Sequence, residues 1–409
     1  MKSSTGLPIF TLALGCLFFL SACDSGLVSG DGRIYPGGQY FGEHLALDGD
    51  HLLASAWGTD DAFVLDRGTE GWSVRSDLSP GSSSGEFGFS VSLQDGIAVV
   101  GSPVFGGERG SSVYIFEQEG STWSRAAALD PPSELRTERW FGETVRVSNG
   151  VVAASLGPVR EELSGNLVDS AAVVFYEKEA GSWRETGRVS EPVFERSTAF
   201  SGSGFGGAFD LDGDRFAVSS PGEDYNGIRD SGVVRIYERV GDRWELSAAV
   251  QTDDPSGNGG IGNRAVELDG STLVTDASGR DSAGLPARVL VVFRETGGVW
   301  RQEAVLRPET IGTRDSYGWT YDLDGDRLAV SASGRADFRG SALVFARTAA
   351  GTWELEQEVW PEGLGPNSLF GEDVALDGDR LMVGAAGVGG EEGGVYEFRR
   401  QGGEWVQVR

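Results

Sequence analysis

Cysteine is almost absent from this sequence of 409 residues. The two cysteines, Cys16 and Cys23, both fall within the N-terminal stretch, and none follows. Beyond Cys23 the chain therefore has no disulfide and no thiol chemistry, so we expect its folded part to be held by packing alone. Hydrophobic residues make up 39% of the chain, which is enough for a sizeable core.

Positive charge is also scarce. The chain has 62 acidic and 34 basic residues, a formal net charge of −28, and only Lys2 and Lys178 are lysines. A field of this sign repels nucleic acid and anionic lipid surfaces, because both are themselves negatively charged. We therefore predict that the folded part binds no nucleic acid.

The N-terminal segment is typical of an export signal. Lys2 precedes an apolar stretch, Leu7–Leu20, that is too short to span a bilayer comfortably. It ends in Leu20-Ser21-Ala22-Cys23, which resembles the lipobox of bacterial lipoproteins; the alternative is an ordinary secretory signal. The resemblance implies cleavage of residues 1–22, lipidation of Cys23 and a tether over residues 23–36. We expect an exported bacterial lipoprotein that is membrane-anchored in the cell envelope, on its periplasmic or surface side.

Two markers recur seven times in the rest of the chain. The first is an aromatic residue followed by glycine, with isoleucine in one copy, and the second is a tryptophan. The first series is Phe41-Gly42, Phe87-Gly88, Phe141-Gly142, Phe205-Gly206, Ile261-Gly262, Tyr317-Gly318 and Phe370-Gly371. The second series is Trp72, Trp123, Trp183, Trp244, Trp300, Trp353 and Trp405. Two independent markers that agree on seven units predict a repeat architecture.

Each unit is predicted to contain four strands. In the clearest copy, Phe205–Trp244, a strand after the aromatic–glycine pair turns at Asp212-Gly213, and strands at Arg215–Ser219 and Val233–Tyr237 follow before the one that starts at Trp244. An Asp-Gly or Asn-Gly pair occurs in all seven units and favours a two-residue hairpin turn. Seven such units predict an all-β, seven-bladed β-propeller of four-stranded antiparallel blades over residues 37–409.

The repeat resembles the FG-GAP unit of integrin alpha-subunit propellers and of many exported bacterial proteins. Phe205-Gly206 and Ser220-Pro221 stand where that family has its FG and its Ala-Pro. The spacing of Tyr237 and Trp244 is also similar to kelch repeats, which form propellers too. Because the last unit stops early at Arg409, we expect Ile34-Tyr35-Pro36 to complete its outer strand and close the ring.

We predict that the variable loops within the blades and the connections between blades lie on the same face of the propeller. Leu156–Ser170 and Pro221–Ser231 are two of these variable loops. A face of variable loops on a regular scaffold is where binding sites usually lie. We take Pro221–Ser231 as the candidate ligand loop, with Glu223, Asp224, Tyr225, Asn226 and Asp230 as its binding residues. Oxygen ligands from Asp224, Asn226 and Asp230 are a candidate calcium site.

Other acidic and aromatic residues are interpreted as structural. Asp210-x-Asp212-x-Asp214 and Asp322-x-Asp324-x-Asp326 alternate like calcium ligands, but Arg215 and Arg327 follow where such a loop needs glycine. We therefore expect hairpin turns with solvated aspartates. The tryptophans outside the series include Trp140, Trp319 and Trp360, for which core packing is the expected role.

The expected function is a non-catalytic binding or adhesion module that presents its loops to a protein or glycan ligand. His44 and His51 are the only histidines, and both are expected to be structural. The absence of thiols and of zinc-binding histidine spacing argues against catalysis. Two alternatives stay open: an envelope enzyme of the glycan hydrolase type that uses acidic loop residues, and a structural subunit of an envelope complex.

Overall fold

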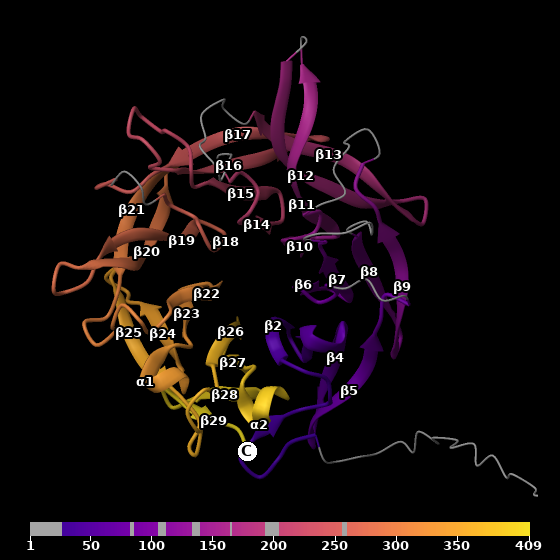
Figure 1. Cartoon of the computed structure of the whole chain (residues 1–409), viewed down its shortest axis with the longest axis vertical. Coiled ribbons are helices and arrows are strands. Elements are labelled where there is room, and N and C mark those ends of the chain that lie inside the picture. Colours follow the sequence, from indigo (N-terminus) through magenta and orange to yellow (C-terminus); the bar gives the residue numbers. More distant parts are fainter. Residues whose placement is uncertain are drawn as a thin grey trace, which may run out of the picture.

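The computed structural model is an all-β, seven-bladed propeller, which confirms the predicted fold (Figure 1). The structure describes residues 27–81, 86–104, 112–132, 140–163, 166–192, 204–255 and 260–409, with side chains left out at 158–170 and 191–192. The predicted signal peptide and Cys23 lie outside these residues. Within them, no helix is long and apolar enough to span a bilayer.

Each blade is a four-stranded antiparallel meander whose first strand lies nearest the axis (Figure 1). Blades 1 to 3 comprise β2–β5 (Phe41–Asp48, His51–Ala56, Asp61–Gly68, Gly71–Leu78), β6–β9 (Ser90–Gln94, Ile97–Ser102, Ser112–Glu119, Thr122–Leu129) and β10–β13 (Val145–Ser148, Val151–Leu163, Asn166–Glu179, Ser182–Pro192). Blades 4 and 5 comprise β14–β17 (Phe209–Asp212, Arg215–Ser220, Val233–Val240, Arg243–Val250) and β18–β21 (Val266–Asp269, Thr272–Arg280, Pro286–Thr296, Val299–Leu306). Blades 6 and 7 comprise β22–β25 (Tyr317–Asp324, Arg327–Ala332, Ser341–Arg347, Trp353–Val359) and β26–β29 (Phe370–Asp377, Arg380–Ala385, Val395–Gln401, Glu404–Gln407).

The remaining elements are short. They are the strand β1 (Arg33–Ile34), the 3-10 turn η1 (Trp57–Thr59) and the helical turns α1 (Arg335–Phe338) and α2 (Val388–Glu391). One predicted loop, Leu156–Ser170, is largely strand, because β11 and β12 stay paired from Val159↔Ser170 out to Leu163↔Asn166.

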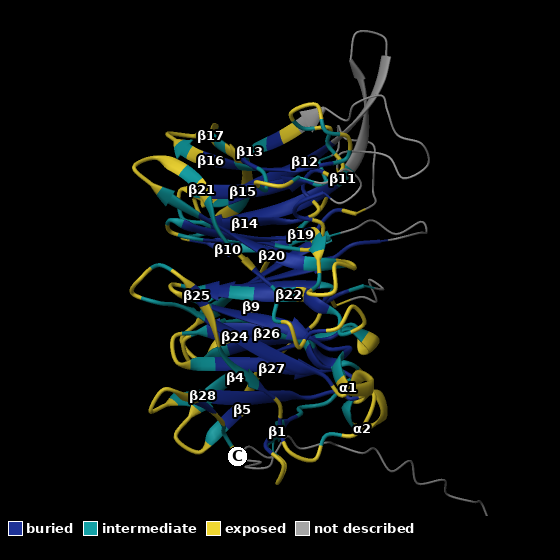
Figure 2. Ribbon diagram, turned by 90° about the vertical axis from the view of Figure 1, so that its left-hand side faces the viewer, coloured by how far each residue is buried: buried dark blue, intermediate teal, exposed yellow. Residues whose placement is uncertain are grey.

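The core lies between the blades (Figure 2). The described residues form seven buried apolar clusters, each shared by two neighbouring blades, and one of the seven joins blade 7 to blade 1. When a sheet packs on both of its faces, its strands have apolar residues on both sides, so polar and apolar residues alternate less regularly than in a surface strand. This explains continuous apolar runs such as Leu52–Ala54. Stability therefore depends on how well each blade packs on the next.

The aromatic–glycine pair anchors each blade to the one before it. Phe370 is fully buried, while Gly371 has a φ of +84° and lies so close to blade 6 that a Cβ would be 2.4 Å from the carbonyl oxygen of Ser341. The glycines of all seven pairs have positive φ: Gly42, Gly88, Gly142, Gly206, Gly262, Gly318 and Gly371. Glycine is needed here both for the left-handed backbone and for the close approach.

We expect Gly371→Ala to destabilise the protein by more than the roughly 1 kcal/mol that a left-handed alanine costs, because the clash with Ser341 involves backbone. Gly378→Ala is the matched control, since Gly378 also has positive φ (+59°) but has open space around its Cβ. Thermal melting of both variants measures the difference. Equal losses would contradict the close-packing role.

The Asp-Gly pairs have a second role that the sequence did not show. In five blades the aspartate is the last residue of the inner strand rather than a turn residue, and only Asp95-Gly96 and Asn149-Gly150 supply two left-handed turn residues. At this last strand position a polar side chain accepts a hydrogen bond from the first turn N–H of the next blade. The seven bonds are Asp48 to Asp95, Gln94 to Asn149, Ser148 to Gly213, Asp212 to Gly270, Asp269 to Gly325, Asp324 to Gly378 and Asp377 to Gly49. The expectation of solvated aspartates is therefore wrong for Asp212 and Asp324, whose side chains belong to a closed circle of bonds between blades, whereas Asp214 and Asp326 are exposed.

The N-terminal segment closes the ring as predicted. β1 pairs with β28 through Ile34↔Val395, while β29 pairs with the rest of the same edge, from Phe398 to Gln401. Ile34 is only 1% exposed and packs in the cluster that joins blade 7 to blade 1. Chain segments from the two ends of the sequence thus share one blade.

Candidate functional site

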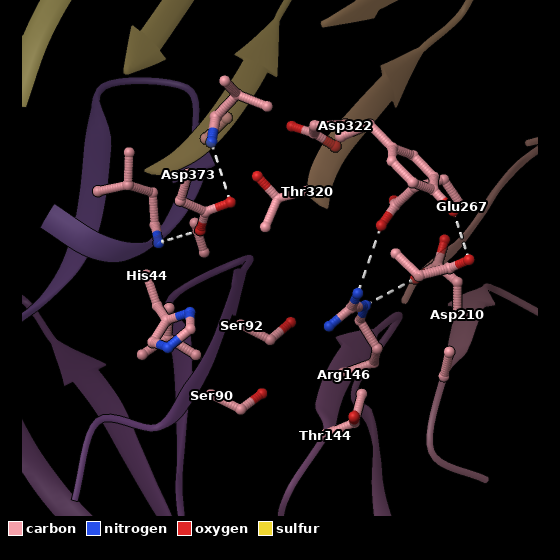
Figure 3. Close-up of a pocket in the computed structure, with 18 of the residues that line it drawn as sticks. His44, Ser90, Ser92, Thr144, Arg146, Asp210, Glu267, Thr320, Asp322 and Asp373 are labelled. Carbon is pink, nitrogen blue, oxygen red and sulfur yellow. Dashed lines mark hydrogen bonds and ion pairs between the residues drawn. The ribbon is translucent and has the colours of Figure 1, made fainter. Parts of the chain in front are cut away.

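A cavity of about 570 Å³ occupies the axis of the propeller and is lined by the inner strands of all seven blades. Alternate side chains of a strand point to the same side, so every second residue of each inner strand faces this channel. Figure 3 shows the polar residues that result, at two depths. The residue two positions before the end of each inner strand lies at the deeper level. The residue four positions before that end lies at the level nearer the loop face.

The deeper level holds one guanidinium among three carboxyl groups. Arg146 Nε lies 3.0 Å from Asp210 Oδ1, and its Nη2 lies 3.3 Å from Glu267 Oε1 (Figure 3). Asp210 also accepts the backbone N–H of Leu268, and Asp322 accepts that of Leu376 at 2.6 Å. These last two bonds again join neighbouring blades, so the ring itself fixes the positions of the carboxyl groups.

Burial raises the pKa of these carboxyl groups. Asp322 reaches a pKa of about 7, chiefly because it is removed from water and further because Asp210 and Asp373 are negatively charged. Burial, followed by the charge of Asp210, raises the pKa of Glu267 well above its usual range, although Arg146 opposes the shift. One guanidinium does not offset all the negative charge, so protons are shared within the cluster at neutral pH.

Asp322 and Glu267 each keep an available oxygen. Oδ2 of Asp322 accepts the Leu376 N–H and Oε1 of Glu267 accepts from Arg146, and in the described part of the chain the other oxygen of each carboxyl group has no hydrogen-bond partner. By contrast, Asp210 uses one oxygen for Leu268 and the other for Arg146. A carboxyl group with a near-neutral pKa and one uncommitted oxygen is suited to take a proton from water.

The level nearer the loops contains Asp373 and His44. Asp373 accepts the backbone N–H groups of Leu45 and Val374, and burial raises its pKa to about 7. His44 is surrounded by protein, which lowers its pKa to about 4, so its ring is neutral at pH 7. The expectation that His44 is purely structural missed its place in the channel wall. His51 does lie outside the cavity, with Nδ1 2.7 Å from Asp66 Oδ1.

A second cavity, of about 510 Å³, adjoins the channel at blade 5. Arg264 stacks on the ring of Trp319 at 3.6 Å, and Arg288 lies 5.3 Å from the same ring. Trp319 is 41% exposed and lines the channel, so core packing is the wrong explanation for it. The same correction applies to Trp140 and Trp360, which are 41% and 53% exposed.

The loop chosen from the sequence, Pro221–Ser231, is held largely by its own contacts. Glu223 makes a two-bond ion pair with Arg235, and Asp224 Oδ1 accepts the N–H of Asp230 at 2.8 Å. None of its five predicted binding residues (Glu223, Asp224, Tyr225, Asn226 and Asp230) lines the channel or the adjoining cavity.

Calcium binding by Asp224, Asn226 and Asp230 stays a prediction. Among the described residues, no group of three or more His, Cys, Asp or Glu side chains is arranged to hold a metal ion. Asp230 is instead paired with Arg229, its neighbour in the chain, at 3.2 Å.

The geometry thus defines a seven-bladed propeller with a polar, acid-lined central channel. The chain matches no protein-family model and no curated protein. Among solved structures it is similar to a periplasmic gluconolactonase of Pseudomonas aeruginosa, with 14% identity over 85% of this chain and 91% of that one and a TM-score of 0.52. It is also similar to 6-phosphogluconolactonase-like proteins of Bacteroides fragilis (12% identity, 85% and 89% coverage, TM-score 0.50) and Bacteroides uniformis (11% identity, 85% and 90% coverage, TM-score 0.53). At these identities the likeness shows the shared fold.

These neighbours overturn the prediction of a non-catalytic binding or adhesion module. Propellers that cover 85% of this chain carry the names of lactone-hydrolysing enzymes, which favours the enzyme alternative. The physical reason for the error lies in the carboxyl groups: among 62 acidic residues no pair stands out in the sequence, since Asp210, Glu267 and Asp322 come from three different repeats. The carboxyl groups that line the channel are also on inner strands, not on the loops where the alternative had placed them.

Proposed function

We propose that this protein is an exported hydrolase that opens the ring ester of a sugar-acid lactone in its central channel. The observation that carries the proposal is the half-buried Asp322 carboxyl group in the channel wall, with a pKa of about 7 and a free oxygen, beside the Arg146 cluster. The lactonase names of the similar propellers support the choice of substrate class.

Hydrolysis of a lactone needs three groups, and the channel supplies each of them. Asp322 takes a proton from the attacking water as its oxygen bonds to the carbonyl carbon. Arg146 stabilises the negative charge that develops on the carbonyl oxygen; three of its N–H groups are bonded in the described structure, to Asp210, Glu267 and the Val145 carbonyl, which leaves two donors for the substrate.

The remaining step is protonation of the ring oxygen as its bond to the carbonyl carbon breaks. Glu267, whose pKa burial raises well above its usual range, donates this proton from its protonated form and then regains one from Asp322. One water is consumed and a hydroxy acid is formed. Because the product ionises, each turnover releases one proton to solution.

Proton release from D-glucono-1,5-lactone, followed with a pH indicator, tests the proposal. The protein should accelerate ring opening well above the spontaneous rate and should show saturation with substrate. Ring opening of several neutral sugar lactones at the spontaneous rate alone would contradict the proposal.

We further propose that the propeller is tethered to a membrane through lipid on Cys23. The lipobox-like segment supports this, and the periplasmic location in the name of the Pseudomonas aeruginosa neighbour agrees with export. Metabolic labelling with an alkyne fatty acid should mark the full-length protein in bacteria, and Cys23→Ser should abolish the label. Label retained by that variant would refute the anchor. The relation of the repeat to the FG-GAP unit likewise remains a proposal, supported by the aromatic–glycine anchor of each blade.

A further inference from the structure

Two guanidinium groups converge on the second cavity, which residues of blade 5 line, and a single carboxylate there faces both. Asp276 is only 2% exposed; its Oδ1 accepts the backbone N–H of Arg264 at 2.8 Å, and its Oδ2 lies 3.7 Å from Arg288 Nε. Both arginines and Asp276 line this cavity. The local charge is therefore positive, in a chain whose net charge is −28.

Arg264 is held in place without an ion pair. Its guanidinium stacks on Trp319 at 3.6 Å, and in the described part of the chain its side chain makes no hydrogen bond or ion pair. Stacking on an aromatic ring fixes the plane of the guanidinium while its N–H donors stay available. Arg288 is nearby, and repulsion between the two like charges is relieved when an anion lies between them.

We propose that this cavity binds the anionic group of the substrate, a carboxylate or a phosphate, through Arg264 and Arg288. Guanidinium N–H groups match the oxygens of both anions in paired hydrogen bonds. The inference rests on the proposed function, because that function identifies the anion bound in this cavity as part of the substrate. Asn263 and Arg264 line both cavities, so a sugar whose acidic end lies here extends its lactone ring into the channel.

Isothermal titration of the full-length protein with three matched sugars tests the site without any turnover. Glucose is the neutral probe, glucuronate carries a carboxylate at C6, and glucose 6-phosphate carries a phosphate there. We expect at least one acidic sugar to bind about tenfold or more tightly than glucose, because hydrogen bonds between charged groups contribute roughly 1.5–3 kcal/mol. The tighter of the two identifies the anion.

Arg264→Gln should remove this preference, and Arg264→Lys should restore part of it. Arg280→Gln is the matched control, since Arg280 is an exposed arginine of the same blade that bonds to the Gly284 carbonyl and lines neither cavity. Equal affinities for the three sugars, or a preference that survives Arg264→Gln, would overturn the proposed subsite.

The titration separates this proposal from the hydrolase proposal. Binding of an acidic sugar that depends on Arg264, in a protein with no lactonase activity, supports the anion site and refutes only the reaction. Hydrolysis of neutral lactones with an unchanged KM in Arg264→Gln and no preference for acidic sugars refutes the anion site and leaves the reaction standing.

Discussion

Asp322→Asn is expected to lower kcat/KM for sugar lactones by about 100-fold or more, because a positioned general base contributes roughly 10²–10⁴ in rate. The substitution keeps the shape of the side chain, and its amide oxygen still accepts the Leu376 N–H. What it removes is the group that takes a proton from water. Initial rates of proton release measure the effect.

Asp324→Asn is the matched control for this variant. Asp324 lies two residues further along β22 and also accepts a backbone N–H of blade 7, from Gly378, but it does not line the channel. We expect it to retain activity. In the wild-type protein kcat/KM should rise with pH through about 7 as Asp322 loses its proton. Equal losses in the two variants, or a pH-independent rate, would show that Asp322 has only a structural role.

Loss of the Asp322 proton, which should raise activity, should lower the stability of the folded protein. Because burial raises the pKa of Asp322 from 3.8 to about 7, the native state holds a proton that the unfolded chain loses between these values. Its contribution to stability therefore falls as pH rises from about 4 to 7. Asp322→Asn should melt at a higher temperature than wild type at pH 8, and the difference should shrink as the pH falls towards about 4.

Ile34→Ala is expected to destabilise the protein by about 2–5 kcal/mol, the usual cost of removing a large buried aliphatic side chain. Ile34 is 1% exposed and packs against Phe41 and Val395, where the first and last blades meet. Loss of this contact weakens the junction between blades 7 and 1, the one pair of neighbouring blades that do not follow each other in the chain. Thermal melting or denaturant titration measures the change.

Ile34→Val is the graded control and should cost about 0.5–1.5 kcal/mol. Deletion of residues 24–37 should be at least as harmful as Ile34→Ala, because it also removes the pairing of β1 with β28. A deletion variant that melts at the wild-type temperature would contradict the closure role of this segment.

The architecture of the propeller can be predicted from the amino-acid sequence alone. Each blade has its own aromatic–glycine anchor, hairpin turn and tryptophan, and these are local signals that recur in every repeat. The blade count and the closing role of Ile34 followed from them without coordinates. Local chemistry was sufficient because six of the seven blades each form from one contiguous stretch of chain, and every blade packs only on its neighbours.

The candidate site, by contrast, is visible only in the folded protein. Arg146, Asp210, Glu267 and Asp322 belong to four different blades, and they meet because the ring turns every second residue of each inner strand towards one axis. Their pKa shifts come from this shared burial, which no single repeat displays. In the sequence the carboxyl groups of the candidate site are scattered among 62 acidic residues, and they become a group only when the seven blades close.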